Sequence, residues 1–416
     1  MDEARVVEQV WRQESSRLLG ALLRITRSVD RAEDLAQEAL AQALESWPRT
    51  GVPDNPAAWL MNTAKRRAID QFRAGERQLR AYAEVGAGTR EAYEAEFDEA
   101  LAEEHVRDDV LRLMFTCCHP ALTPESRTVL TLRLVAGLST REIARAFLSS
   151  ESTVASRISR AKRTLADARA PMEEPVGQER AERLDSVMSA VYLVFNEGHT
   201  ATEGEDWTRP DLCREAVRLA AILASVTPSE PEAHALLALL ELQSSRLASR
   251  VGPGGEPVLL ADQDRSRWDA DAISRGTAAL DVAVRLGGDG PYVLQAAIAA
   301  EHARAASVET TDWERIAGLY ARLARATGSL VVELNRAVAL GRARGPEAGL
   351  AVVDDLMTAP ALARYHLLPS VRGDLLEQLG RHDEAAAEFR RAAGLASNDR
   401  ERALLRARAE AQGPSR

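Results

Sequence analysis

The chain has 416 residues, with 53 basic and 63 acidic side chains and a formal net charge of −10. Hydrophobic residues at 45% and charged residues at 28% exclude wholesale disorder, and aromatic residues at only 4% favour helices over a large sheet. No apolar run approaches the roughly 18 residues that cross a bilayer, and the N-terminal residues lack an apolar signal core, so we expect a cytoplasmic protein that does not contact a membrane.

Four segments are predicted from breaks in the helical pattern. Prolines and glycines separate runs of helical periodicity, and a polar, acidic stretch follows the first run. At about 100–200 residues per domain, the length fits two to four domains. Along the chain we expect a helical domain at residues 1–75, an acidic linker at 76–104, a second helical domain at 105–172 and a helical extension at 180–416.

The stretch from Asp34 to Pro48 is predicted to form an amphipathic helix. One face is polar and acidic and includes Asp34, Gln37 and Glu38. Such a face is usually only solvated, but it can also bind a basic partner. The predicted buried stripe on the opposite face consists of Leu35, Ala39, Leu40, Ala43, Leu44 and Trp47.

A second helix, which begins at Asn55 and Pro56, is predicted to have a very different surface. Its predicted buried positions are Trp59, Leu60, Ala64, Ala68, Ile69 and Phe72. Its remaining surface gathers the polar or cationic side chains of Asn62, Thr63, Lys65, Arg66, Arg67 and Arg73. Arginines beside polar and aromatic side chains suit a single-stranded or melted nucleic acid, because they neutralise phosphates while bases stack.

Residues 123–165 show the layout of a helix-turn-helix. Thr123 begins a helix that Gly137 can end, and Ser139 with Glu142 forms a capping box for the next, short helix. After a turn of about four residues, a longer helix is expected from residue 152 to 165. Its predicted inward residues, at helical spacing, are Val154, Ile158, Ala161 and Leu165.

The helix-turn-helix lies in the basic part of an otherwise neutral or acidic chain. Residues 119–170 contain nine basic and four acidic side chains, a net charge of +5. A solvated helical hairpin has no need of this charge, which favours DNA binding. On the longer helix we expect base edges to be read by Ser156, Ser159 and Arg160, and phosphates to be contacted by Arg157, Lys162 and Arg163.

The order of these segments resembles that of RNA polymerase sigma factors of the extracytoplasmic-function (ECF) type. DLAQEALAQALESW resembles the region-two helix that docks on the polymerase clamp, and PAAWLMNTAKRRAIDQFR resembles the segment that melts and reads the minus-ten element. GLSTREIARAFLSSESTVASRISRAKRTL resembles the region-four helix-turn-helix that reads the minus-thirty-five element. The resemblance covers about residues 8–170.

The resemblance implies two partners, core RNA polymerase (through its clamp and flap) and promoter DNA, with no cofactor and no enzymatic activity. It also implies roles for single positions. Asp34, Gln37 and Glu38 are then clamp contacts, Asn62, Lys65, Arg66 and Arg67 lie at the minus-ten DNA, and Ser156, Ser159 and Arg160 face minus-thirty-five bases.

The remaining residues resemble the subgroup that carries a C-terminal tetratricopeptide-like extension. The phrases FTCCHPAL, FNEGHTA, LLADQDRSRWD and LNRAVAL carry this likeness. Near the end, the spacing typical of the tetratricopeptide repeat is shown by Gly373, Gly380, Ala385, Phe389 and Ala392. The implied fold is all-α: two sigma-factor domains plus a helical-repeat domain. The implied regulation is control by the extension, whose net charge of −9 over residues 171–416 also predicts an intramolecular contact with the basic module.

Two polar clusters could be interpreted as a metal site or an acid–base site. Cys117, Cys118 and His119 are adjacent, which does not match the spacing of zinc ligands, so buried small residues are expected there. Residues 195–199 and 262–268 could form an acid–base site only if they converged, and a buried polar network or a contact surface is favoured. A helix-turn-helix regulator or adaptor with a protein-binding repeat domain remains the alternative to a sigma factor.

Overall fold

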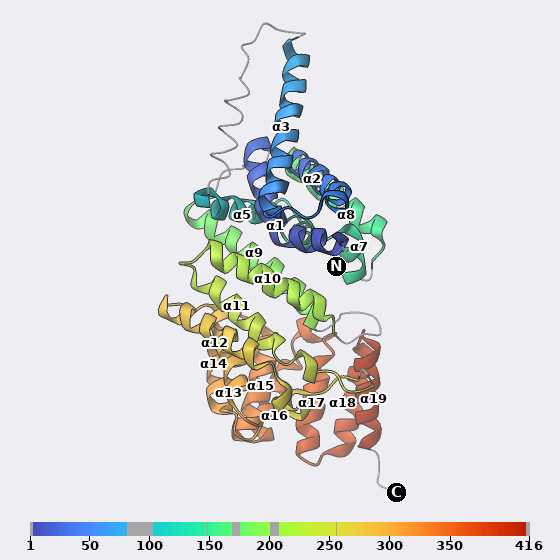
Figure 1. Cartoon of the computed structure of the whole chain (residues 1–416). Helices are drawn as coiled ribbons and strands as arrows, with labels where there is room; N and C mark the ends of the chain where they lie inside the picture. The colour runs from blue at the N-terminus through green and yellow to red at the C-terminus, as the bar shows by residue number, and fades with distance from the viewer. Residues whose placement is uncertain are drawn as a thin grey trace. The chain divides into compact units, whose positions relative to one another are not determined.

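The structure is a computed structural model that describes residues 3–80, 103–147, 149–168, 175–199, 208–254 and 256–412. Within these ranges the chain is helical and contains no β-strand, only one isolated β-bridge between Val251 and Pro257 (Figure 1). This confirms the all-α fold that the composition and periodicity predict. None of the helices in these ranges combines the length and the apolar character needed to span a membrane.

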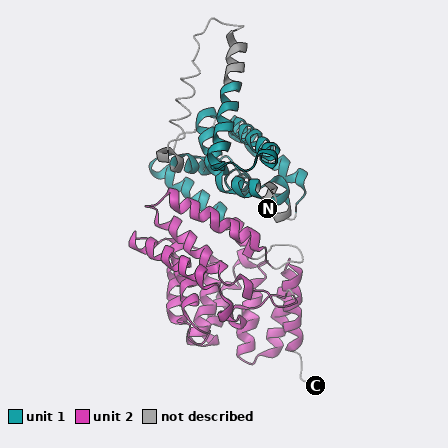
Figure 2. Ribbon diagram, viewed as in Figure 1, with its two compact units in different colours: residues 1–191 teal, residues 192–416 magenta. Residues whose placement is uncertain are grey.

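The chain divides into two compact units, residues 1–191 and 192–416 (Figure 2). The boundary falls inside one helix, α9 (Gly177–His199). Both predicted sigma-type domains therefore belong to unit 1, together with residues 177–191 of α9. The greater part of the predicted linker, residues 81–102, lies outside the described residues.

Unit 1 is built around α1, which packs against α2, α5 and the π-helical turn η1. Its leucines Leu18, Leu22 and Leu23 are almost completely shielded from solvent. The described elements of the unit before α9 are α1 (Glu3–Thr26), α2 (Val29–Thr50), α3 (Pro56–Arg80), α5 (Glu103–Cys117), α6 (Pro124–Leu130), η1 (Thr131–Val135), α7 (Thr140–Ala146) and α8 (Glu151–Asp167).

The helix-turn-helix forms as its sequence signals predict. The capping box is complete, because Ser139 N donates to Glu142 Oε2 over 2.8 Å and Glu142 N donates to Ser139 Oγ over 3.2 Å. Ser150 caps α8, and the four predicted inward residues of α8 are all buried. One feature differs: the helix that Thr123 caps widens into η1 before it ends at Gly137, whose φ of +71° suits glycine.

The amphipathic helix α2 buries a different stripe from the predicted one. Leu35, Ala39, Ala43 and Trp47 are buried as expected, but Leu40 is half-buried and Leu44 is 47% exposed. The buried positions are instead completed by Val29, Ala32, Glu33 and Ala36. Small side chains on this face allow α1 and α3, which both pack on α2, to approach closely.

The buried face of α3 is largely the predicted one. Leu60, Ala64, Ala68 and Ile69 are buried, and so is Thr63, which was wrongly expected on the open polar surface. Trp59 is half-buried and meets Trp47 of α2 edge-on, with ring centroids 5.5 Å apart and an interplanar angle of 71°. Two further predicted positions, Phe72 and Arg73, lie outside the residues whose side chains the structure describes.

Unit 2 is a succession of helices in which neighbours in sequence pack on one another, as α11 does on α12 and α17 on α18 (Figure 1). This arrangement is typical of helical repeats. Its described α-helices after α9 are α10 (Pro210–Val226), α11 (Pro231–Ser244), α12 (Ala270–Arg285), α13 (Pro291–Arg304), α14 (Trp313–Thr327), α15 (Leu330–Arg344), α16 (Pro346–Leu356), α17 (Leu367–Gln378), α18 (His382–Leu395) and α19 (Asp399–Ala411).

The predicted repeat signature marks a real helical pair, α17 and α18. Ala385, Phe389 and Ala392 of α18 are fully buried in one apolar cluster. Gly373 of α17 lies against the Phe389 ring, and a Cβ at this position would be 2.8 Å from Phe389 Cε1. Gly380 has a φ of +71° between the two helices. The small residue thus permits the close helix approach that the spacing predicts.

Gly373→Ala is expected to destabilise unit 2 by about 1–3 kcal/mol, because its methyl group overpacks the contact with Phe389. Gly318→Ala in α14 is the matched control. No atom lies within 4 Å of the added methyl group there, so the better helix propensity of alanine should leave stability unchanged or raise it by about 0.5–1 kcal/mol. Urea unfolding followed by hydrogen exchange of α17 and α18 measures both effects. Equal stability of the two variants would contradict the packing assignment.

Candidate nucleic-acid and protein interfaces

The cationic face of α3 is open to solvent. Asn62, Arg66 and Arg67 are exposed and Lys65 is half-buried, while the opposite face of the helix is anchored in the core of unit 1. Arg67 Nε lies 3.8 Å from Glu38 Oε2 of α2. A surface ion pair of this length contributes little to stability, so the guanidinium is available to a phosphate.

The polar face of α2 combines carboxylates with an exposed apolar side chain. Asp34 and Glu38 are exposed and Gln37 is half-buried, as the helical period predicts. Leu44, 47% exposed, lies on the same open side of the helix as the exposed Gln42 and Glu45. Apolar and acidic side chains together suit a protein partner better than DNA, because DNA repels carboxylates and offers little apolar surface.

The predicted DNA-reading face of α8 is accessible. Ser156, Ser159, Arg160 and Arg163 are exposed, and Arg157 is half-buried. Arg160 Nη2 lies 3.4 Å from Ser156 Oγ, so the two predicted base-reading side chains are neighbours on one face. An arginine and hydroxyl groups offer the donors and acceptors that base edges require.

Lys162 of α8 has a different environment. Its Nζ lies 2.7 Å from Glu33 Oε2 and 3.0 Å from Asp30 Oδ1, both on α2. Burial by itself lowers the pKa of Lys162, but hydrogen bonds and charges from Glu33 and Asp30 outweigh it and raise the pKa. Lys162 is therefore protonated at neutral pH, and its ammonium group is held by the two carboxylates of α2.

Glu33 is the centre of this contact. It is a buried carboxylate that accepts a second hydrogen bond of 2.7 Å, from Arg133 Nε in η1. Arg133 Nη1 also donates to Leu138 O over 3.2 Å, just before the capping box. One carboxylate on α2 thus binds α8 and also η1, the turn that precedes the short helix of the helix-turn-helix. Sequence reasoning missed Glu33, although its position on the face of Val29 and Ala36 marks it as an inward residue.

A second contact joins α1 to the start of the helix-turn-helix. Trp11 Nε1 donates to Gly137 O over 3.1 Å, and Arg12 pairs with Glu142 of the capping box. A Cβ on Gly137 would lie 2.6 Å from Ser15 Oγ, so the approach of α1 also depends on the missing side chain. The helix-turn-helix is therefore fixed within unit 1 at two places.

The surroundings of Cys117 and Cys118 are those of buried, structural side chains. Cys117 and Cys118 are fully buried free thiols, as predicted. Cys118 Sγ lies 3.6 Å from Thr131 Oγ1, and Cys117 Sγ lies 3.8 Å from Leu130 O. Burial raises the pKa of Cys118 to about 11, so this thiol stays protonated at neutral pH. Among the described residues no group of three His, Cys, Asp or Glu side chains is placed to hold a metal ion.

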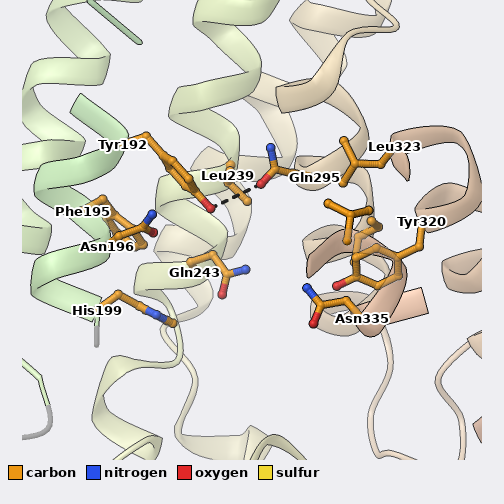
Figure 3. A pocket seen from close by; sticks show the side chains of 12 residues that line it. Tyr192, Phe195, Asn196, His199, Leu239, Gln243, Gln295, Tyr320, Leu323 and Asn335 are labelled. Atoms are coloured by element: carbon orange, nitrogen blue, oxygen red, sulfur yellow. Dashed lines mark hydrogen bonds between the residues drawn. The ribbon is translucent and has the colours of Figure 1, made fainter. Parts of the chain in front are cut away.

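Several charged residues that an acid–base site would need are engaged in other contacts. Glu197 pairs with Arg209 over 2.8 Å, and Asp264 caps the short turn that follows it. Arg265 donates to the carbonyl oxygens of His302 and Ala305, both over 2.8 Å. These contacts form the polar network that fixes helix packing. Two other residues of the segment 195–199, Asn196 and His199, line a cavity in unit 2 (Figure 3).

Comparisons with known proteins match three separate stretches of the chain to three families. Residues 10–78 match the family Sigma-70 region 2, and residues 112–165 match Sigma-70, region 4. Residues 183–284 match a family of unknown function, DUF6596. This last match begins in the part of α9 that belongs to unit 1 and continues into unit 2.

Two kinds of relative are found. The chain is 47% identical over 388 residues to an uncharacterized protein of Rhizobium meliloti (strain 1021), covering 93% of this chain and 91% of the relative. It is 30% identical over 155 residues to the ECF RNA polymerase sigma factor SigK of Mycobacterium tuberculosis (strain ATCC 25618 / H37Rv), covering 36% of this chain and 78% of that protein. SigK of Mycobacterium ulcerans (strain Agy99) is 29% identical over 154 residues.

Glu33→Gln is expected to lower the stability of unit 1 by about 3 kcal/mol, because Lys162 and Arg133 are left without their buried carboxylate. Glu45→Gln, on the exposed side of the same helix, should change stability by less than about 0.5 kcal/mol. Hydrogen exchange of α2 and α8 in urea reports the local free energy of opening. A small effect of Glu33→Gln, equal to that of Glu45→Gln, would show that the contact contributes little.

Proposed function

Because the chain belongs to the ECF sigma factors of RNA polymerase, we propose that it binds core RNA polymerase in the cytoplasm and directs promoter-specific initiation, under control of its C-terminal helical extension. The observation that carries the proposal is that α2 and α3 present two neighbouring surfaces of opposite charge. The carboxylates Asp34 and Glu38 lie on one, and the guanidinium groups of Arg66 and Arg67 on the other. A protein partner and a DNA strand can thus be bound at the same time.

The polymerase contact is assigned to α2. Asp34, Gln37 and Glu38 are the proposed clamp contacts, supported by the exposure of both carboxylates and by the exposed Leu44 farther along the open side of the helix. The opposite face of α2 is buried against α1 and α3, so this surface is held rigidly. Rigid presentation reduces the entropy lost on docking.

The minus-ten strand is assigned to α3. Asn62, Lys65, Arg66 and Arg67 are the proposed contacts, with the amide available to bases and the cations to phosphates. Trp59 is half-buried a turn before them, in edge-to-face contact with Trp47, which makes the start of α3 a firm support.

The minus-thirty-five element is assigned to α8. Ser156, Ser159 and Arg160 are the proposed base-reading residues, and Arg157, Lys162 and Arg163 the proposed phosphate contacts. Lys162 is bound to Glu33 and Asp30 in unit 1, so its contact with a phosphate requires that this pair open. We propose that α8 leaves α2 when the protein is bound to polymerase and promoter.

The proposed control by the extension is supported by α9. Arg183 is buried, and its Nη1 lies 3.3 Å from Phe115 O of α5. Arg127 Nη1 of α6 lies 3.4 Å from Ser186 Oγ. The chain that follows the region-four match therefore braces α5 and α6, which precede the helix-turn-helix, before it continues into unit 2. In this proposal the extension supports the active fold of the sigma domains.

The double variant Arg66→Ala/Arg67→Ala is expected to abolish promoter opening and to retain polymerase binding. Alanine is chosen over glutamate because Arg67 lies 3.8 Å from Glu38, and a reversed charge would disturb the proposed clamp contact. Permanganate footprinting measures strand opening, and co-purification with core polymerase measures binding. Arg17→Ala, an exposed arginine on α1, is the control and should open promoters normally. Normal opening by the double variant would refute the role of α3.

Truncation separates the contribution of α9 from that of the rest of the extension. A chain ending at Val176 lacks the Arg183 donor, and an unsatisfied buried carbonyl such as that of Phe115 costs about 1–3 kcal/mol. We expect this chain to lose promoter-dependent transcription. A chain ending at His199 keeps α9 and should retain the fold of unit 1, with an output that differs from that of the full chain. Equal transcription by all three chains would exclude control by the extension.

A further inference from the structure

Unit 2 contains a cavity of about 850 Å³, which is in the range of small-molecule sites, roughly 300–1,000 Å³. Its wall is formed by the end of α9, the chain that follows α11, and parts of α15, α17 and α19. A smaller cavity of about 220 Å³ shares three lining residues with it, Asn196, His199 and Asn335. Figure 3 shows these side chains around the smaller cavity, with Asn196 and His199 on one side and Asn335 on the other.

Two arginines line the large cavity close to His199. Arg246 donates through Nε and Nη2 to Gln243 Oε1, over 3.0 and 2.6 Å, and this partner is an uncharged amide. Within the described part of the chain Arg246 forms no ion pair with a carboxylate. Arg250 Nη2 donates to the main-chain oxygen of His199 over 3.0 Å. The donors that remain on Arg246 are therefore available to a ligand.

His199 adds an unused polar atom to the same wall. Its Nε2 is buried and has no hydrogen-bond partner among the residues that the structure describes. The ring stacks on Phe195, with centroids 5.4 Å apart and an interplanar angle of 22°, so its orientation is fixed. A buried polar atom without a partner costs free energy, which a ligand atom at hydrogen-bond distance would recover.

The electrostatics of this wall favour a negative charge. Burial lowers the pKa of Arg246 to about 10. Burial, and then the charge of Arg246, lower the pKa of Arg250 to about 9. Burial and the same two arginines hold the pKa of His199 well below its ordinary value. At neutral pH the guanidinium of Arg246, which pairs with no carboxylate among the described residues, thus lies in a poorly solvated site beside a neutral imidazole, and an anion there would be favourable.

We propose that this cavity binds a small organic anion, whose carboxylate or phosphate group is held by Arg246, Arg250 and His199. The guanidinium fork suits both groups. The wall also contains polar side chains such as Gln263 and Asn335, and an apolar part formed by Leu259 and Leu260 near the short turn and by Leu404 and Leu405 of α19. An aliphatic or aromatic body is therefore expected on the anion. Glu401 also lines the cavity, but it pairs with His366 over 3.0 Å.

Calorimetric titration of the full chain tests this proposal with three probes of similar size: phenyl phosphate, phenylacetate and the neutral benzyl alcohol. We expect at least one anion to bind saturably, and at least about tenfold more tightly than the alcohol, the difference that a charge-assisted hydrogen bond supports. The two anionic probes decide between the phosphate and the carboxylate as the recognised group. Absence of saturable binding by both anions, or equal binding of the alcohol, would overturn the proposal.

Two variants test the residues. Arg246→Gln should weaken binding of the anion at least about tenfold, while Arg285→Gln, which removes an exposed arginine of α12, should leave it unchanged. His199→Phe keeps the stacked ring and removes the unpartnered nitrogen, so it should weaken binding without lowering the unfolding temperature of the free protein. A merely structural role would give the reverse for His199→Phe, a less stable protein with unchanged binding. Unchanged affinity in both Arg246→Gln and His199→Phe would place the anion elsewhere.

Discussion

One buried carboxylate, Glu33, provides the ionic part of the contacts that hold the helix-turn-helix in unit 1. It receives Lys162 of α8 and Arg133 of η1, each over 2.7 Å, and both cations are mostly shielded from water. Buried charges of this kind are costly unless they are paired, so the three side chains form or break their contact together. The pairing ties α8 to α2, while the buried residues of α8 pack on α6 and α7 and leave Ser156, Ser159 and Arg160 on its open side.

The same interaction links folding to the proposed function. Lys162 can neutralise either Glu33 or a DNA phosphate, but not both, and the competition makes the free arrangement of unit 1 less attractive to DNA than its net charge suggests. The acidic total of the chain, −10, acts in the same direction. In the proposed function the chain reaches DNA as part of polymerase, and the binding to polymerase and promoter supplies the free energy that opens this pair.

Local signals in the sequence were sufficient to predict the helices, but not the contacts between residues far apart in the chain. The capping box of Ser139 and Glu142 and the packing of Gly373 on Phe389 involve residues close together in the chain, and both form as predicted. The pair between Arg133 and Glu33 joins residues 100 positions apart, and no local pattern marks it. The burial of α2 differs from its apolar stripe, because close packing favoured alanines over Leu44.

The surroundings of the cavity in unit 2 could not be predicted from the sequence either. Residues 195–199 looked polar enough for chemistry, yet only the fold shows that His199 lies beside Arg246 and Arg250 rather than beside a catalytic partner. His199 is the last residue of α9, whose earlier turns contact α5 and α6 in unit 1. A ligand at the end of this helix would therefore act on an element that both units contain.

The most direct measurement is a comparison of transcripts made in vitro by core polymerase alone and by core polymerase with the full chain, on genomic DNA of the source bacterium. Sequencing of the transcript 5′ ends locates every start site without assuming a promoter sequence. The account predicts new start sites that lie downstream of one shared pair of sequence elements, at the minus-ten and minus-thirty-five positions. Start sites identical to those of core polymerase alone, with the chain bound to the enzyme, would contradict it.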